Sequence, residues 1–148
     1  MYEEYSKQAV SSKRYRELLG TALYVFNSNN SFIIENILAN DAPGEHNWHD
    51  LIDLTSGPLK KPIKNTITKN FDTTIENSFS DLVDVRNRIM HSFPVTAPSG
   101  ISDDVDNQVL ATKDKKSGTQ SYITEKLLLD FIKENEVLSR ALHNLRGH

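Results

Sequence analysis

The fold of this 148-residue chain is decided by residues 62–91, PIKNTITKNFDTTIENSFSDLVDVRNRIMH. Apolar side chains recur there at the three- and four-residue spacing of one helix face: Ile67, Phe71, Ile75, Phe79, Leu82, Val85, Ile89 and Met90. Pro62 suits the first turn of a helix, whereas Pro94 and Pro98 prevent its continuation. The pattern predicts one long amphipathic helix over residues 62–91.

Apolar spacing predicts further helices on both sides of this stretch. We expect them over residues 2–27, 32–39, 48–54 and 125–146. The polar run 27–30 is expected to stop the first of these helices and to start the next. Thr124 suits the capping position of the last helix, and Trp48 is expected to anchor the core.

A polar segment rich in proline, glycine and serine, residues 94–106, follows the long helix and predicts a loop. Two short runs with strand character come next, 108–112 and 119–123, joined by a turn with lysines at its tip. We therefore predict a β-hairpin inserted at about residues 107–123. The expected architecture is mainly α: an up-and-down helical bundle of four to five helices in a single domain, residues 1–148.

Composition narrows the possible functions. The chain has 17 basic and 20 acidic residues, a formal charge of −3, so binding of a polyanion requires a local basic patch. The absence of cysteine excludes disulfides and thiolate chemistry. No apolar run approaches the roughly 18 residues of a membrane span, and the acidic, aromatic N-terminus differs from a secretory signal. We expect a cytoplasmic protein without membrane contact.

The end of the long helix, DVRNRIMHSF at residues 84–93, concentrates polar chemistry. Arg86 falls inside the apolar arc of the helical wheel, where a guanidinium is costly unless it is paired or faces a cleft or an interface. Asn87 and His91 are four residues apart and can interact. Asp84 is expected to form a surface ion pair with Arg88, and both are predicted to support a candidate active site together with Asn87.

These residue types match the needs of RNA cleavage without a metal or another cofactor. A histidine can move the proton of the attacking 2′-hydroxyl or of the leaving oxygen. An arginine can bind the phosphate and offset its developing charge, and an amide can orient the imidazole. The structural alternative is that Arg86 pairs with a glutamate of the first helix and that His91 only ends its helix. The glutamates available for that pair are Glu3, Glu4 and Glu17.

Residues 86–91, RNRIMH, resemble the Arg-polar-x-x-x-His motif of the HEPN superfamily, and Ser92-Phe93 is similar to the small-aromatic pair that often follows it. The resemblance implies a small helical ribonuclease domain of the kind found in toxin–antitoxin, abortive-infection and phage-defence systems. It implies that Arg86 and His91 are catalytic, with Asn87 in a supporting role. It also implies a homodimer in which two motifs share one cleft, and a possible antitoxin or defence-system partner protein.

Two features depart from the commoner HEPN members, namely the inserted hairpin and the acidic charge. Both leave open an alternative, a non-catalytic helical module that binds RNA, nucleotides or a protein. Arg86 and His91 lie about 140° apart on an ideal helical wheel, so one helix presents them awkwardly to one phosphate. A site composed from two copies of the chain is therefore expected.

Lysines outside the motif are weaker candidates for contacts with RNA. Lys113, Lys115 and Lys116 at the hairpin tip are candidate RNA-binding residues, although lysine clusters are usually solvated surface. Lys60 and Lys61 are expected to lie about 38 Å along the helix from Arg86 and to make peripheral contacts at best.

Two histidines invite comparison with a metal site, but the pattern is weak. His46 and His49 lie near Glu45 and Asp50 at a junction between a loop and a helix. Zinc sites show stronger ligand sets, so no metal is expected.

Overall fold

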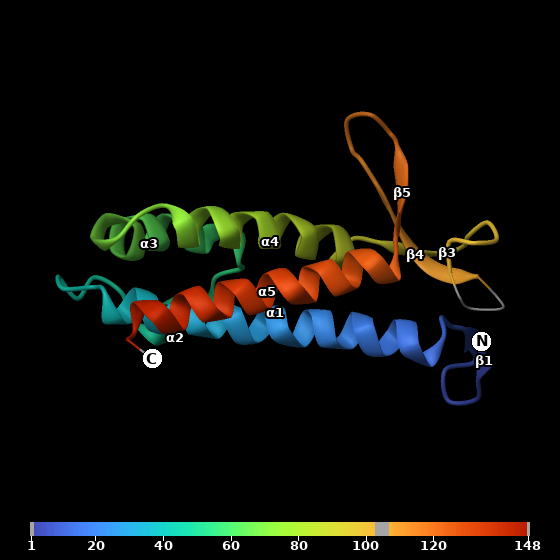
Figure 1. The fold of residues 1–148 in the computed structure, drawn as a ribbon, viewed down its shortest axis with the longest axis horizontal. Helices are drawn as coiled ribbons and strands as arrows, with labels where there is room; N and C mark the ends of the chain where they lie inside the picture. The colour runs from blue at the N-terminus through green and yellow to red at the C-terminus, as the bar shows by residue number, and fades with distance from the viewer. Residues whose placement is uncertain (1, 103–106, 148) are drawn as a thin grey trace.

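The computed structural model describes residues 2–102 and 107–147. Three long helices lie alongside one another: α1 (Lys13–Ala39), α4 (Thr74–Met90) and α5 (Glu125–Leu145) (Figure 1). Short helical segments join α1 to α4: α2 (Trp48–Asp53), η1 (Gly57–Leu59), α3 (Lys60–Ile63) and η2 (Lys64–Thr68), the last a π-helix. The predicted mainly α architecture is confirmed.

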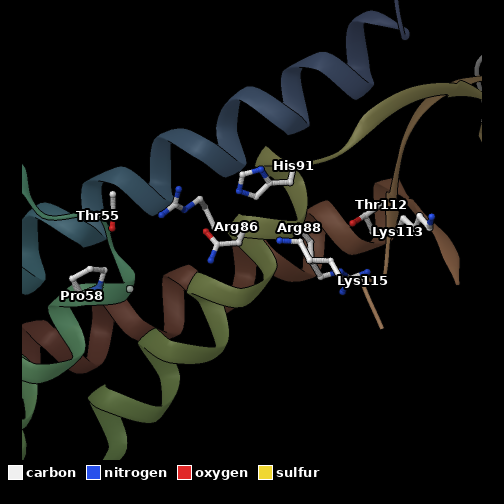
Figure 2. Close-up of a pocket in the computed structure, with 10 residues that line it drawn as sticks. Thr55, Pro58, Arg86, Arg88, His91, Thr112, Lys113 and Lys115 are labelled. Carbon is white, nitrogen blue, oxygen red and sulfur yellow. The ribbon is translucent and has the colours of Figure 1, made fainter. Parts of the chain in front are cut away.

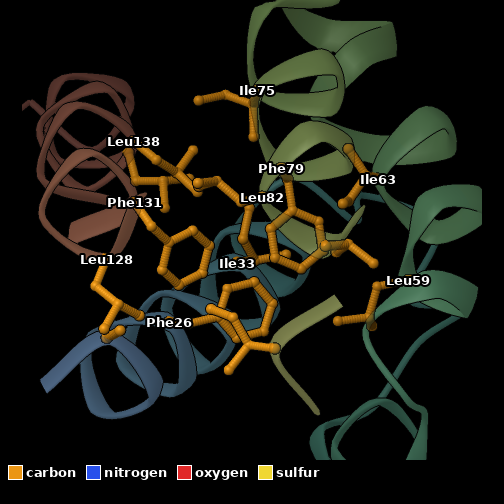
Figure 3. Packing of buried hydrophobic residues seen from close by; sticks show 14 of the residues in the cluster. Phe26, Ile33, Leu59, Ile63, Ile75, Phe79, Leu82, Leu128, Phe131 and Leu138 are labelled. Carbon is orange, nitrogen blue, oxygen red and sulfur yellow. The ribbon is translucent and has the colours of Figure 1, made fainter. Parts of the chain in front are cut away.

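The core lies between the three long helices, and each of them contributes one central phenylalanine. Phe26 of α1 stacks on Phe79 of α4, with ring centroids 5.8 Å apart, and on Phe131 of α5 at 6.1 Å (Figure 3). All three rings are buried, and isoleucine and leucine side chains surround them. Such stacked rings add specific geometry to the burial of apolar surface. The position of α4 against α1 is thereby fixed close to Arg86.

The first part of the chain differs from the prediction, because α1 is one uninterrupted helix and starts later. Residues 2–9 form a small hairpin of β1 (Tyr2–Glu3) and β2 (Gln8–Ala9), and Ser12 caps α1 by accepting a hydrogen bond from the Tyr15 N–H. The polar run 27–30 does not break the helix. Asn29 is buried there and its Nδ2 donates to Oδ1 (2.9 Å) and the backbone carbonyl (2.8 Å) of Asn135 in α5.

The helix predicted over residues 62–91 is divided in two. It is interrupted between η2 and α4, where Asp72 accepts a 2.8 Å hydrogen bond from the Thr74 N–H at the start of α4. Buried Glu76 accepts from the Thr68 hydroxyl and ties the two pieces together. Phe71, expected on the apolar face, is 50% exposed at this break. Since α3 packs beside α4, the segments before α3 come close to the C-terminal half of α4.

Trp48 was expected in the core and is 46% exposed. It is the first residue of the short helix α2, and its ring meets the His49 ring edge-on at the surface, with centroids 5.8 Å apart. Leu51, one turn further along, is the residue of α2 that is buried.

The predicted hairpin is confirmed as β4 (Gln108–Lys113) and β5 (Gln120–Ile123), and it belongs to a larger sheet. β3 (Phe93–Thr96), in a segment expected to be a loop, pairs antiparallel with β4. β3 is an edge strand, which explains why Pro94 is tolerated there. Residues 103–106 of the expected loop lie outside the described residues.

Tyr15 fastens this sheet to the bundle. Its buried hydroxyl donates to the Ile123 carbonyl of β5 (2.5 Å) and accepts from the Leu110 N–H of β4 (3.1 Å). Burial raises the pKa of the Tyr15 phenol. Thr124 then starts α5 as predicted, because its side chain accepts from the Leu127 N–H. Over the two described ranges, no helix has an apolar stretch long enough to cross a bilayer.

Candidate functional site at the end of α4

A cavity of about 620 Å³ lies where α4 ends. We call it the α4 cavity. Three segments that are distant in sequence supply its walls (Figure 2): Thr55, Gly57 and Pro58 before α3; Arg86, Asn87, Arg88 and His91 at the end of α4; and Thr112, Lys113 and Lys115 from the hairpin. Its size is in the range of ligand-binding pockets.

The α4 cavity is cationic although the chain as a whole is acidic. Two arginines, two lysines and one histidine line it, and none of its lining residues is an aspartate or glutamate. Clustered charge of one sign in a concave site raises the local concentration of oppositely charged ligands. The geometry therefore favours an anion, and the arginine side chains are suited to phosphate oxygens.

Arg86 lies partly buried in this wall. Its guanidinium carbon is 5.4 Å from the centroid of the Phe26 ring, and its Nε atom is buried without a hydrogen bond. Within residues 2–102 and 107–147, no carboxylate forms an ion pair with it. A cation held against an aromatic face and left unpaired has spare capacity for an anionic ligand.

The structural alternative, a glutamate of the first helix paired with Arg86, is wrong. Glu3 pairs with Arg16 instead, with 3.0 Å between the carboxylate and the guanidinium. Glu4 and Glu17 are exposed, and neither forms an ion pair with Arg86. An ion pair inside the bundle therefore does not explain the position of Arg86 on the apolar arc.

His91 is the C-cap residue of α4, directly after its last helical residue, Met90. Its backbone N–H donates to the Asn87 carbonyl (3.0 Å), and its side chain is exposed. The described residues offer its imidazole no hydrogen-bond partner, so both ring nitrogens remain available to a ligand. Asn87 is likewise exposed and lines the same cavity, one turn before His91.

Arg86 and His91 reach the α4 cavity from a single chain (Figure 2). The helical-wheel argument that one helix presents them awkwardly is therefore wrong. Regular helix ends at Met90, and the backbone of His91 is already turned away from helical values (φ −101°, ψ 15°), so an ideal wheel does not describe its direction. A second copy of the chain is not needed to bring these two side chains to one cavity.

Arg88 belongs to the cavity, whereas Asp84 does not. The predicted ion pair between them is absent, and the Arg88 Nη2 atom instead donates to the Ser121 hydroxyl of β5 over 3.4 Å. Asp84 is exposed and is not among the residues that line the cavity. Of these two residues predicted to support the active site, Arg88 therefore lies at the cavity and Asp84 outside its lining.

The three hairpin lysines divide into two groups. Lys113 and Lys115 line the α4 cavity, whereas Lys116 does not. Lys60 and Lys61 are also absent from its walls, but the predicted separation of about 38 Å is wrong, since Lys60 and Val83 line one small neighbouring cavity. The break before α4 explains this difference, because it lets α3 lie beside α4.

The segment before α3, residues 55–58 at the start of η1, is the wall that the sequence did not reveal. Thr55, Gly57 and Pro58 line the cavity because Ser56 is buried and its hydroxyl donates to the Asn30 side chain in α1 over 2.8 Å. No local motif points to this contact. Its only signal in the sequence is the Ser-Gly-Pro turn itself.

The histidines near α2 do not form a metal cluster. Over residues 2–102 and 107–147, no group of three or more histidine, aspartate or glutamate side chains is placed to hold a metal ion. Asp41 accepts the backbone N–H groups of His46 (2.7 Å) and Glu45 (3.2 Å), and these bonds hold the pKa of its carboxyl below the ordinary value. These residues organise a loop.

The fold and the site define a helical bundle with a cationic cavity built around one arginine–histidine pair. No family model, no curated protein and no solved structure matches this chain. Functional conclusions therefore depend on the chemistry of the α4 cavity.

Proposed function

We propose that this chain is a metal-independent endoribonuclease of the HEPN type, in which Arg86 and His91 cleave RNA through attack of a 2′-hydroxyl group. The observation that carries the proposal is that both side chains line one cationic cavity that contains no carboxylate. A cavity with this lining suits a phosphodiester and offers no acidic ligand set for a metal.

Each side chain has a role in the proposed reaction. Arg86 binds a non-bridging phosphate oxygen and offsets the charge that develops during attack. His91 transfers a proton, either from the 2′-hydroxyl or to the leaving 5′-oxygen. The bond from O2′ to phosphorus forms as the bond from phosphorus to O5′ breaks, which yields a 2′,3′-cyclic phosphate and a 5′-hydroxyl. Asn87 supports the phosphate or the imidazole by hydrogen bonding.

A homodimer is part of the proposal. The reaction needs a base and an acid, and the α4 cavity of one chain contains one imidazole. Two exposed apolar side chains flank His91, namely Met90 (55% exposed) and Phe93 (39%), and they offer surface to a second copy. Two cavities brought together would supply two imidazoles. An RNA substrate, a cytoplasmic location and a toxin or phage-defence setting with a partner protein complete this proposal.

A second candidate belongs to another class, a helical module that binds RNA or nucleotides without cleaving them. The single imidazole per chain favours this candidate, because one imidazole cannot serve as base and acid together. Phosphate binding needs no imidazole, since Arg86, Arg88 and the hairpin lysines suffice for it. Both candidates place the RNA in the α4 cavity, and they differ in whether the bound RNA is cleaved.

The proposal is tested by incubating the protein with RNA in the presence of EDTA and analysing the product ends. Wild type is expected to yield 2′,3′-cyclic phosphate ends. His91→Ala is expected to cleave about 100- to 10,000-fold more slowly, the usual contribution of general acid–base catalysis. His49→Ala, which removes an exposed histidine outside the cavity, should cleave as wild type does.

Equal cleavage by wild type and His91→Ala contradicts the enzymatic proposal. Absence of cleavage by wild type, together with tight RNA binding, establishes the second candidate instead.

A further inference from the structure

The hairpin of β4 and β5 reaches the α4 cavity from the side away from the segment before α3. Figure 2 shows Thr55 and Pro58 on one side of the α4 residues, and Lys113 and Lys115 on the other. Figure 1 shows that the hairpin extends beyond the bundle. A strand bound at Arg86 therefore passes the hairpin as it leaves the cavity on that side.

The base of the hairpin is held firmly to the bundle. The Tyr15 hydroxyl bonds both β4 and β5, and the Arg88 guanidinium donates to Ser121 in β5. Arg88 lines the cavity and also touches the hairpin, so the two walls are linked. The placement of the hairpin next to Arg86 is part of the folded structure.

The tip of the hairpin is organised by one carboxylate. The Asp114 Oδ1 atom accepts from the Lys116 N–H (2.9 Å), the Ser117 N–H (2.7 Å) and the Ser117 hydroxyl (3.1 Å). These bonds hold the pKa of Asp114 below its ordinary value. Gly118 closes the turn at a positive φ of 73°, which suits glycine. The turn fixes the backbone on either side of Lys115.

Lys115 and Lys116 are adjacent, equally charged and both exposed, but only Lys115 lines the cavity. The side chain of Lys113 follows the hairpin, where its Cε atom is 3.8 Å from the place a Cβ would take on Gly118. The turn thus places one of its two neighbouring lysines in the lining of the cavity and the other outside it.

We infer that the hairpin is a phosphate clamp, in which Lys115 binds the phosphate that neighbours the one held by Arg86. The inference rests on the proposed function for the identity of its ligand, an RNA strand. The bundle then supplies the reacting groups, and the hairpin holds the flanking backbone. Lys115 acts as a positioning residue because it touches a phosphate that does not react.

The test uses a 2′-O-methylated oligouridylate, which binds as RNA does but lacks the attacking hydroxyl. Its affinity is measured at several salt concentrations for wild type, Lys115→Ser and Lys116→Ser. The logarithm of the binding constant K falls linearly with the logarithm of the salt concentration. Loss of one phosphate contact makes this slope less negative by about 0.7 for a single strand. Lys115→Ser is expected to show this change and a roughly fivefold loss of affinity at low salt, and Lys116→Ser neither.

Equal changes for the two variants would mean that only the total charge matters, and this result overturns the clamp. The clamp is also overturned if both variants keep the salt dependence of wild type, or if wild type does not bind the oligouridylate. Both lysines are exposed, so folding is not at risk. Because the probe is not cleavable, the outcome is separate from the test of the enzymatic proposal, which uses unmodified RNA.

Discussion

The two ends of α4 each carry a charged side chain that is shielded from solvent, and the surroundings of these two side chains differ. Near the start of α4, buried Glu76 accepts from the Thr68 hydroxyl (3.1 Å) and has the Lys64 ammonium at 4.0 Å. Near its end, Arg86 lies over the Phe26 ring with a buried Nε that has no hydrogen bond, beside a cationic cavity. A shielded charge with partners stabilises the fold, whereas a shielded charge without them is available to a ligand.

Among changes at the two ends of α4 and at the hairpin, the largest expected effect is the loss of activity in Arg86→Met. Removal of a group that stabilises charge in the transition state lowers turnover by about 100- to 1000-fold. The free energy of unfolding should change by less than about 1 kcal/mol, because the lost contact with the Phe26 ring is offset by relief of an unpaired cation. Cleavage rates and urea denaturation of the same preparation measure both quantities. A loss of several kcal/mol in stability would show that Arg86 is structural.

Glu76 is expected to behave in the opposite way. Glu76→Ala removes the acceptor of the Thr68 hydroxyl and should lower the free energy of unfolding by about 2 kcal/mol. Cleavage by the folded fraction should stay within about twofold of wild type, since Glu76 does not line the α4 cavity. Glu76→Gln keeps an acceptor and serves as the matched control with a smaller loss. If Glu76→Ala lowered turnover without lowering stability, the distinction between a structural Glu76 and a functional Arg86 would be wrong.

Features that depend on neighbouring residues could be predicted from the sequence, and those that depend on distant partners could not. The Thr124 cap, the β4–β5 pairing and the unusual place of Arg86 follow from local spacing. The continuity of α1 depends on Asn29 bonding to Asn135, 106 residues away. Nothing in the spacing around residue 29 indicates that partner.

The same distinction between neighbouring and distant residues applies to the candidate site. The motif at the end of α4 was found from its residue types, but two of the three walls of the cavity come from elsewhere in the chain. The segment at residues 55–58 is held there by the hydrogen bond from Ser56 to Asn30. The difference between Lys115 and Lys116 depends on the shape of a turn, which composition does not specify.

A third prediction concerns the attachment of the hairpin wall to the bundle. Tyr15→Phe leaves the Leu110 N–H and the Ile123 carbonyl without their partner and should cost about 1.5 kcal/mol of unfolding free energy. The phenol pKa is raised in the folded state, so the unfolded chain loses this proton first as the pH increases. The corresponding stability is fully present below about pH 10 and is lost as the pH rises further.

Urea denaturation between pH 8 and 11 measures this effect. Wild type should lose stability more steeply than Tyr15→Phe above about pH 10, because only wild type carries the perturbed phenol at position 15. Parallel curves would show that the Tyr15 hydroxyl is not held as the structure describes. Circular dichroism at pH 8 confirms that both proteins are folded at the start.

The smallest expected effect separates geometry from charge at the hairpin tip. Asp114→Ala removes a negative charge beside Lys115, so simple electrostatics predicts tighter RNA binding. The clamp predicts the opposite, a few-fold weaker binding, because three hydrogen bonds that shape the turn are lost. Asp114→Asn retains an oxygen acceptor and loses the charge, so it should bind as well as wild type or better. If both variants bind more tightly, the shape of the turn is irrelevant and Lys115 acts only through its charge.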